Sequence, residues 1–320
     1  MKRFLPHFIP LAAALLFAAP SFAQFPNKPI RIVVPFPAGS ATDTITRILG
    51  QSVSAAVGQP VLVDNKAGAD GAIAGAEVAK AAPDGYTLLM ATNSPMAVVP
   101  AMKKAPPYDP VADFTPITDI GRYTFFLYIH AETPIKTFKD LVAYAKANPG
   151  KLNYATGNTT GIVSFGQMNS LAGIEMTHVP YRGEPQAITD IVGGRVQLLW
   201  ATPTTGLAHV KDGKLRALAT NLKTRSSLLP DVPTMTEVGI PQYSVVSWAG
   251  LYAPAKLPRD IQLRLNKDFH DAMRRPEVVA QMEKQAFLMT PTTPEELGNF
   301  TKSQIEAYRA ILKSIGMQPE

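Results

Sequence analysis

Residues 30–43 read IRIVVPFPAGSATD, and this stretch decides the class of fold. Its opening run, Ile30–Val34, is apolar and β-branched, which is typical of a buried parallel strand. A turn over residues 35–40 follows the run. Apolar residues then recur at helical spacing from 45 to 57, and Gly58 ends the pattern. The sequence therefore predicts a strand, a turn that contains glycine, and an amphipathic helix.

Strands and helices continue to alternate after this first unit. Residues 61–63 and 87–90 are predicted strands, and the small side chains of residues 71–80 predict a helix that can pack closely on a sheet. A strand–helix–strand–helix–strand order is typical of a parallel sheet with right-handed crossovers. We therefore expect an α/β domain in the first part of the chain.

A second unit with the same order begins near residue 123. Its predicted strands are 123–129, 152–154, 179–181 and 196–200, and its predicted helices are 138–147, 162–172 and 185–192. The chain from Ile261 onward is predicted to be mostly helical, with helices at 261–273, 278–285 and 294–312. Two α/β domains suit a chain of 320 residues that is 46% hydrophobic.

The N-terminus has the features of an export signal. Lys2 and Arg3 give a positive start, residues 11–19 are apolar, and Ser21-Phe22-Ala23 is a small-x-small cleavage site. An uncleaved transmembrane helix needs about 20 apolar residues, and several prolines interrupt this stretch. We expect residues 1–23 to be a signal peptide that is cleaved after Ala23, and the exported protein to act in the periplasm.

The composition argues against several classes of function. The chain has no cysteine, which excludes disulfides, thiolate metal sites and a cysteine nucleophile. Its formal charge is +6, and without Lys2 and Arg3 it has 29 basic against 25 acidic residues, a net charge of +4. The basic residues are dispersed along the chain, so we expect no nucleic-acid partner.

Two loops with a common pattern are the best candidates for a ligand site. Residues 38–40 lead from a strand to Thr42 and Asp43, which are good N-cap types, and residues 156–161 lead to a helix from Ile162. The first turn of a helix leaves backbone N–H groups unpaired and carries partial positive charge. Such a helix start binds a carboxylate or phosphate without Arg or Lys. Two of them facing each other across a cleft would hold an anion between two domains.

Alternatives exist for these loops. Each could be an ordinary connection between a strand and a helix, and Asp43 could cap its helix rather than contact a ligand. Residues 91–94 follow the third strand of the first unit. We expect them to border the same cleft, because open α/β sheets bind ligands at the carboxyl ends of their strands.

Signatures of catalysis are missing from the sequence. Residues 161–166 do not have the G-x-S-x-G spacing of a nucleophile turn, and the histidines lack the spacing of metal ligands. No glycine loop has the spacing that binds nucleotides. Glu184 and Asp190 could be an acid/base pair, but we interpret them as solvated helix residues. We expect no catalytic residue, no metal and no cofactor.

A series of short motifs runs through the whole mature chain. The motifs are residues 30–43, quoted above, 63–71 (VDNKAGADG), 83–88 (PDGYTL), 108–110 (YDP), 179–183 (VPYRG), 213–219 (GKLRALA) and 229–234 (LPDVPT). In this order they resemble the Bug-type solute receptors of tripartite tricarboxylate transporters.

The resemblance implies a type II periplasmic-binding-protein fold, in which two α/β domains joined by a two-strand hinge close on a ligand in the cleft between them. We place domain 1 at residues 24–123 and 247–320, and domain 2 at residues 124–246. In this family the first loop holds a ligand carboxylate through backbone amides and hydroxyls, and a Gly/Ser/Thr loop of the second domain lies opposite. The predicted ligand-binding residues are Phe36, Ala38, Gly39, Ser40, Thr42, Asp43, Thr92, Asn93, Thr156, Gly157, Asn158, Thr159, Thr160, Gly161, Arg182 and Thr202.

Two departures from the family pattern concern the ligand. Many relatives have an aspartate after the strand that ends here at Trp200, where this chain has Ala201 and then Thr202. The missing acid favours a carboxylate without an ammonium group. Relatives often have a histidine shortly after the threonine that matches Thr92, and this chain has none there. Arg182 could pair with a second carboxylate or could face outward.

The resemblance implies a receptor that captures a small carboxylate, an aliphatic or aromatic mono- or dicarboxylate, by domain closure. It would deliver the ligand to the membrane subunits of a tripartite tricarboxylate-type transporter. An alternative is a receptor that reports the carboxylate to a membrane sensor kinase. A secreted hydrolase using Ser40 or Ser164 is the third and least supported hypothesis. We expect the receptor to be a monomer.

Overall fold

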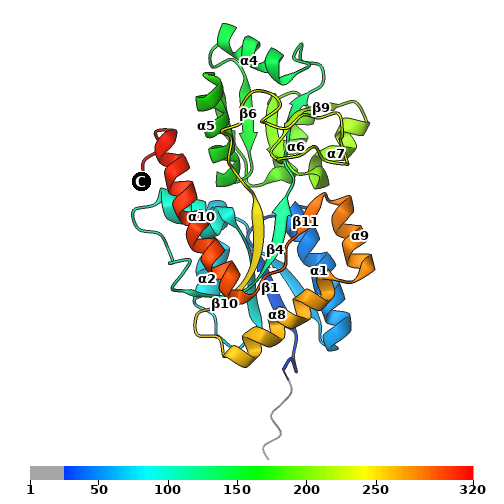
Figure 1. Cartoon of the computed structure of the whole chain (residues 1–320), viewed down its shortest axis with the longest axis vertical. Helices are drawn as coiled ribbons and strands as arrows, with labels where there is room; N and C mark the ends of the chain where they lie inside the picture. Colours follow the sequence, from blue (N-terminus) through cyan, green and yellow to red (C-terminus); the bar gives the residue numbers. More distant parts are fainter. Residues whose placement is uncertain (1–24, 320) are drawn as a thin grey trace, which may run out of the picture.

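The computed structural model describes residues 25–319. The chain forms two α/β units, one above the other in Figure 1, and each is built around its own sheet. The predicted cleavage site after Ala23 lies outside the described residues.

The lower unit contains the first sheet. Its strands are β1 (Ile30–Val34), β2 (Val61–Asn65), β3 (Thr87–Thr92), β4 (Phe114–Tyr123), β10 (Trp248–Pro254) and β11 (Phe287–Met289), in the spatial order β11-β4-β10-β3-β1-β2. β1 lies parallel between β2 and β3, and Ile32 pairs with both Val63 and Leu88. The predicted parallel unit of three strands is confirmed.

Helices surround the first sheet. They are α1 (Ala41–Val57), the short helices η1 (Ala69–Gly71), η2 (Ser94–Val98) and α3 (Val99–Met102), α2 (Ala72–Ala79), α8 (Arg259–Met273), α9 (Pro276–Lys284) and α10 (Pro294–Ser314). The apolar stripe predicted for α1 is buried: Ile45, Leu49 and Val53 are inaccessible to solvent. Gly58 ends this helix with a φ of 70°, a left-handed conformation that glycine adopts without a steric penalty.

β4, β10 and β11 have no counterpart among the predicted strands. β10 runs antiparallel between β3 and β4, pairing residues that are far apart in the sequence, such as Leu251 and Met90. β10 is buried along its whole length, so its apolar run shows no alternation that would mark it as a strand. The pattern of β4 is interrupted by Pro116, Asp119 and Arg122. Neither strand therefore has a recognisable sequence period.

The upper unit contains the second sheet. Its strands are β5 (Phe126–His130), β6 (Asn153–Thr156), β7 (Thr177–Pro180), β8 (Leu198–Ala201) and β9 (Leu215–Thr220), in the order β7-β6-β8-β5-β9. Its helices are α4 (Phe138–Ala147), α5 (Thr159–Ala172), α6 (Glu184–Val192) and α7 (Pro203–Lys211). The strand predicted from residue 123 is wrong at its start, because Tyr123 ends β4 in the first sheet and β5 begins at Phe126.

The chain crosses between the two sheets twice. Thr124 and Phe125 connect β4 to β5, and residues 221–247 lead from β9 back to β10. The crossings are hydrogen-bonded to each other. The Asn221 side chain accepts from the backbone N–H of Phe125 at 2.8 Å, and the Ser247 carbonyl accepts from that of Tyr123 at 3.0 Å. Two paired crossings are the connection expected of this fold class.

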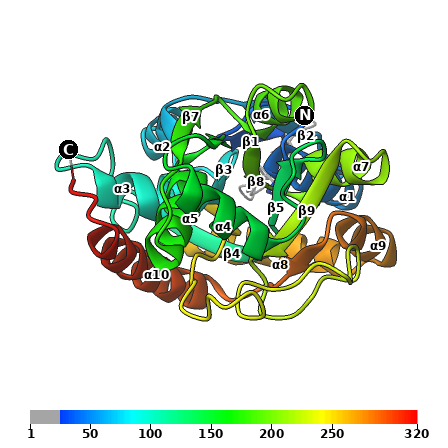
Figure 2. The ribbon, with the colours of Figure 1, turned by 90° about the horizontal axis from the view of Figure 1, so that it is seen from above.

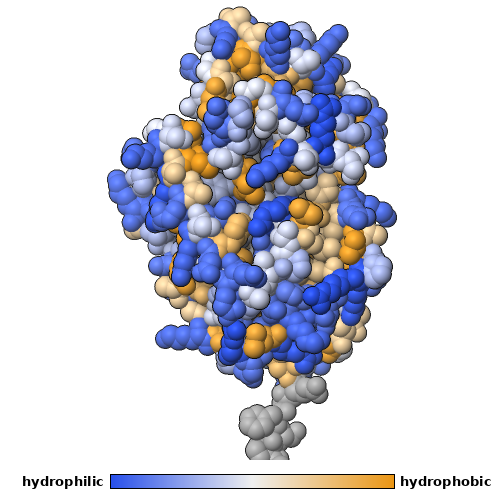
Figure 3. Space-filling view, in the orientation of Figure 1, coloured by the Kyte–Doolittle hydropathy of each residue, from blue (hydrophilic) through white to orange (hydrophobic). Residues whose placement is uncertain are grey.

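The C-terminal helix spans both units. α10 packs on β4 of the first sheet and contacts α5 in the second unit. Seen from above, α8 and α10 lie along one side of the molecule and α2 and α6 along the other (Figure 2). Hydrophilic side chains cover most of the face drawn in Figure 3. None of the helices formed by residues 25–319 is both long enough and apolar enough to cross a membrane.

Candidate functional site

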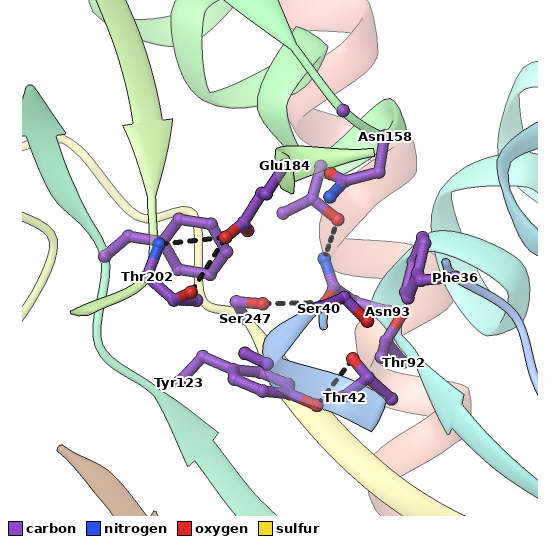
Figure 4. Close-up of a pocket in the computed structure, with 14 residues that line it drawn as sticks. Phe36, Ser40, Thr42, Thr92, Asn93, Tyr123, Asn158, Glu184, Thr202 and Ser247 are labelled. Atoms are coloured by element: carbon purple, nitrogen blue, oxygen red, sulfur yellow. Dashed lines mark hydrogen bonds between the residues drawn. The ribbon is translucent and has the colours of Figure 1, made fainter. Parts of the chain in front are cut away.

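A small cavity lies where the two units meet. Its lining comes from both units and from both crossings (Figure 4). The lining residues are Phe36, Ser40, Ala41, Thr42, Thr92, Asn93, Tyr123, Phe125, Gly157, Asn158, Thr160, Glu184, Thr202 and Ser247. The cavity volume is about 30 Å³, which is room for about two water molecules. Hydrogen bonds between Asn93 and Thr160 and between Ser94 and Thr159 connect the two units beside the cavity.

The loop between β1 and α1 forms one wall of the cavity. Ser40 is the N-cap of α1, and its side chain accepts from the backbone N–H of Asp43 at 3.3 Å. The sequence had suggested Thr42 or Asp43 as the cap, but the helix already begins at Ala41. Within residues 25–319 the N–H groups of Ala41 and Thr42 have no hydrogen-bond partner, as expected for the first turn of a helix. This loop therefore offers free donors beside the cavity.

Asp43 stabilises this loop through hydrogen bonds of its side chain. Its carboxylate accepts from the backbone N–H of Gly39 and from the side chains of Asn65 and Arg47, each at about 3 Å. Burial acts to raise the pKa of Asp43, but these hydrogen bonds outweigh it and hold the pKa below its usual value. Asp43 does not line the cavity. Asp43 is not the helix cap, which is Ser40, and it supports the loop through these hydrogen bonds.

The loop between β6 and α5 forms the opposite wall. Asn158 is the N-cap of α5 and accepts from the N–H of Gly161 at 2.9 Å. The helix therefore begins at Thr159, three residues before the predicted start at Ile162. Gly157 lies so close to the loop before α6 that a Cβ there would come within 2.6 Å of the Glu184 backbone nitrogen. This position needs glycine, and it fixes the two loops against each other.

Hydrogen bonds join the start of α5 to the first unit. The Asn93 amide donates to the Thr160 hydroxyl at 2.6 Å, and the hydroxyls of Ser94 and Thr159 lie 2.5 Å apart. Asn93 also donates to the Tyr308 hydroxyl and accepts from Ser247 and from the N–H of Trp248. All of the hydrogen-bonding capacity of Asn93 is used. Asn93 lines the cavity, but in this closed arrangement it acts as a link between the units.

Thr92 and Thr42 present hydroxyls at the same cavity. The Thr42 hydroxyl is 2.8 Å from that of Tyr123. The Thr92 hydroxyl is buried and has no hydrogen-bond partner among the described residues. A buried polar atom without a partner costs about 1–3 kcal/mol. Thr92 is therefore a group that a bound ligand could satisfy.

Glu184 is the charged residue among those that line the cavity. It begins α6 and is 7% exposed, so it is not the solvated residue that was predicted. Its Oε2 accepts from the backbone N–H and hydroxyl of Thr202, at 3.1 and 2.7 Å, and from the hydroxyl of Thr205 at 3.1 Å. Burial raises the pKa of Glu184 against the effect of these hydrogen bonds.

Asp190, the other residue of the suggested acid/base pair, lies elsewhere. Its carboxylate accepts from the Tyr181 hydroxyl and from Arg195, and it does not line the cavity. The pair therefore does not form.

Nine of the predicted residues line the cavity and seven do not. The seven are Ala38, Gly39, Asp43, Thr156, Thr159, Gly161 and Arg182. Arg182 is exposed, which favours the outward-facing alternative. The Thr156 hydroxyl pairs with His178 Nε2 at 2.6 Å. Whether any of these residues contacts a ligand stays a prediction.

Five lining residues were not predicted. Ala41 adjoins the predicted loop, and Tyr123, Phe125 and Ser247 lie on or beside the crossings. Glu184 could have been found from its position: it directly follows the loop after β7, at the carboxyl edge of the sheet, where ligands of α/β proteins bind.

The charge of the lining is unusual for an anion site. No Lys, Arg or His is among the lining residues, and Glu184 is the one charged side chain there. Positive potential comes instead from the helix starts of α1 and α5. Among the described residues, no three acidic or histidine side chains are grouped so that they could hold a metal ion.

Two α/β units joined by two crossings, with a polar cavity between them, define a solute-binding protein of the periplasmic-binding class. Residues 45–317 match the family model of the tripartite tricarboxylate transporter family receptor. The chain belongs to this family, as its motifs predicted. It is a solute-binding receptor and not an enzyme.

Known relatives agree with this assignment over nearly the whole chain. The protein BugT of Bordetella pertussis is 32% identical over 312 residues, which is 96% of this chain and 95% of BugT. The structure of the periplasmic binding protein BugD has a TM-score of 0.88 and 29% identity, covering 92% of this chain and 100% of BugD. The predicted fold class is confirmed.

Two further solved structures contain carboxylates. A Rhodopseudomonas palustris protein with adipate has a TM-score of 0.89 and 29% identity, covering 93% of this chain and 100% of its own. MatC from the same organism, with bound malate, has a TM-score of 0.85 and 28% identity, covering 90% of this chain and 100% of its own.

Proposed function

We propose that this protein captures a small carboxylate in the periplasm by closure of its two domains and delivers it to a tripartite tricarboxylate-type membrane transporter. The observation that carries the proposal is the unpaired N–H groups of Ala41 and Thr42, two residues that line a cavity without basic side chains. Free amides at a helix start bind a carboxylate group without a counter-ion from a side chain.

The second helix start completes the site from the other domain. Asn158 and Thr160 line the cavity opposite the first loop, and Thr92 adds a hydroxyl without a partner. Solved relatives that hold adipate and malate support a carboxylate as the ligand. The family supports a transporter rather than a sensor kinase as the membrane partner.

Closure provides the mechanism of capture. The bonds from Asn93 to Thr160 and between Ser94 and Thr159 connect the two domains, and in this mechanism they form as the cleft shuts. A ligand that contacts both loops adds to the stability of this state and shifts the population toward it. The transporter then recognises the closed form.

The remaining parts of the proposal concern processing and assembly. We propose that export is followed by cleavage after Ala23 and that the mature receptor is a monomer. We place the domain boundaries at residues 123/124 and 246/247, beside the two crossings.

Melting and calorimetry of the mature protein test the proposal. The ligands are carboxylates, including malate and adipate, each compared with its neutral amide. We expect carboxylates to raise the melting temperature, because a ligand that binds only the folded state stabilises it, and we expect the matching amides to have no effect. A response to neutral sugars alone, with none to any acid, would refute a carboxylate receptor.

A second experiment tests the membrane partner. Receptor saturated with the carboxylate found above should bind the transporter's membrane subunits more tightly than receptor without ligand. Ligand-dependent binding to a sensor kinase ectodomain, with none to the transporter subunits, would contradict the transport role.

A further inference from the structure

We propose that Glu184 selects the ligand by accepting a hydrogen bond from it, so that the preferred carboxylate also carries a hydroxyl or an ammonium group. This inference rests on the proposed function, since it concerns a second contact in the same cavity. It assigns Glu184 as a specificity-determining residue.

The two oxygens of Glu184 have different surroundings. Oε2 is occupied by three donors from Thr202 and Thr205 at the start of α7. Oε1 has no hydrogen-bond partner among the described residues, although the side chain lines the cavity. Figure 4 shows the carboxylate of Glu184 held beside Thr202 at the cavity. One oxygen thus anchors the side chain and the other is available to a ligand.

The position of Glu184 is firmly determined. The residue begins α6, and the loop before it packs against Gly157 at the start of the second ligand loop. Glu184 lines the same small cavity as Ala41 and Thr42, whose amides are proposed to bind the carboxylate, but it lies on a different loop. A ligand held by its carboxylate at the helix starts would present its other end, or its substituent, to Oε1.

The electrostatics favour a donor at this point. A buried carboxylate without a cationic partner is costly, and no basic side chain lines the cavity. The other titratable groups near Glu184 are Tyr123 and Tyr128. Burial, and to a smaller extent the charge of Glu184, raises the pKa of both phenols. An ammonium or hydroxyl group would satisfy Glu184, whereas a second ligand carboxylate would repel it.

The role of Glu184 also changes what the residue Ala201 implies about the ligand. The absence of an aspartate after β8 favoured ligands without an ammonium group. In the structure, the Glu184 carboxylate accepts a hydrogen bond from the backbone N–H of Thr202, the residue that follows β8. An acid is therefore present at that end of the strand, although it comes from a different helix. The missing aspartate therefore no longer argues against a ligand with an ammonium group.

A matched set of four-carbon acids tests the proposal. Butyrate has no second polar group, hydroxybutyrates and aminobutyrates carry the donor on carbon 2, 3 or 4, and succinate carries a second carboxylate. We expect the best donor-bearing acid to bind the mature protein at least about tenfold more tightly than butyrate and succinate, as a charged hydrogen bond implies. Whichever series binds more tightly, the hydroxybutyrates or the aminobutyrates, identifies the group that donates to Glu184.

The variant Glu184→Gln separates recognition from structure. Its amide oxygen can accept the bonds from Thr202 and Thr205, while its NH₂ group replaces the acceptor Oε1 with a donor. We expect E184Q to weaken aminobutyrate binding about thirtyfold or more, to weaken hydroxybutyrate binding less, and to strengthen succinate binding. Asp190→Asn is the control, because Asp190 lies on the same helix outside the cavity. It should leave all affinities unchanged.

The outcomes distinguish this inference from the proposed function. Relative affinities that are the same in E184Q and in wild type would overturn the role of Glu184 and leave the carboxylate receptor intact. Tighter binding of succinate than of every donor-bearing acid to wild type would overturn it as well, even if E184Q failed to fold. Failure of every acid to bind, with a sugar binding instead, would overturn both proposals.

Discussion

The starts of α1 and α5 have the same pattern in the sequence but different surroundings in the structure. Each follows a strand and a glycine-containing loop, and each has a polar N-cap, Ser40 in one and Asn158 in the other. At α1 the first amides, those of Ala41 and Thr42, have no partner among the described residues and belong to residues that line the cavity. At α5 the hydroxyls of Thr159 and Thr160 are bonded to the opposite domain.

The difference shows that one local motif can serve two purposes. The start of α1 is braced by Asp43, Arg47 and Asn65 of its own domain, so its geometry does not depend on closure. At the start of α5 the Thr159 and Thr160 hydroxyls instead have their partners in the other domain. We infer that the first loop holds the ligand carboxylate and that the second loop mainly reports and stabilises closure.

Gly39→Val should have the largest effect, because it removes the receptor function of the first loop. Gly39 has a φ of 80°, which is costly for a β-branched residue, so the loop must change its conformation. We expect carboxylate affinity to fall about a hundredfold or more by calorimetry, which corresponds to about 2.7 kcal/mol.

Gly213→Val is the matched control for this prediction. Gly213 has a φ of 70°, and like Gly39 it has no atom within 4 Å of the position of a Cβ. It follows α7, outside the cavity lining. We expect both variants to lose similar thermal stability and only Gly39→Val to lose the ligand. Unchanged affinity in Gly39→Val would refute the role of the first loop.

Thr160→Val should have an intermediate effect, because it breaks a bond of the closed state. Asn93 would be left with an unpaired buried N–H in the closed form, at a cost of about 1–2 kcal/mol. The proposed closure implies that the open form lacks this bond, and we therefore expect affinity to fall about five- to thirtyfold. Small-angle scattering of the ligand-free protein should show a larger radius of gyration than wild type.

The control for closure is Thr189→Val. The Thr189 hydroxyl donates to a backbone carbonyl within its own helix, α6, and takes no part in the contact between domains. It should leave both affinity and radius of gyration unchanged. Loss of affinity in Thr160→Val without any change in the open population would show instead that Thr160 contacts the ligand directly.

The parts of the fold that have a local period were predictable from the sequence. The three parallel strands of the first sheet and the helix α4 were found, and the bounds of α4 are those predicted. Both loops that line the cavity were also located, because glycine and N-cap residues mark the transition from strand to helix. Nine of the predicted residues accordingly line the cavity.

The rest depended on contacts between distant segments. Tyr123 and Ser247 reach the cavity because β4 and β10 pair across the crossings, and antiparallel pairing of remote strands leaves no local signal. Glu184 looks like any acid at the start of a helix, where it suits the helix dipole. Its burial arises from α6 packing against β8 and α7; its place in the sequence suggested the cavity edge, but only the structure shows that it is buried there.

Asp43→Asn should have the smallest effect on ligand affinity. It tests whether Asp43 only supports the first loop or also contacts the ligand. Asp43 accepts bonds from Gly39, Asn65 and Arg47 but does not line the cavity. We expect the variant to lose about 1 kcal/mol of stability at neutral pH and to change ligand affinity less than about threefold, since it alters the support and not the amides.

The pH dependence of that stability loss follows from the lowered pKa of Asp43. A carboxyl whose pKa is lower in the folded state than in the unfolded state, here below its ordinary value of 3.8, stabilises the fold above that value. The stabilisation disappears as the pH falls through the folded-state pKa. The difference between wild type and Asp43→Asn in urea unfolding should therefore shrink below about pH 4.

Asp140→Asn is the control for this last prediction. Asp140 has a lowered pKa for a similar reason, because it forms the capping box of α4 with Thr137, and it is remote from the cavity. It should reproduce the pH-dependent loss of stability while leaving ligand affinity unchanged. If Asp43→Asn instead lost more than about tenfold in affinity at unchanged stability, Asp43 would be a ligand contact, and the first loop would bind through a side chain as well as through its backbone.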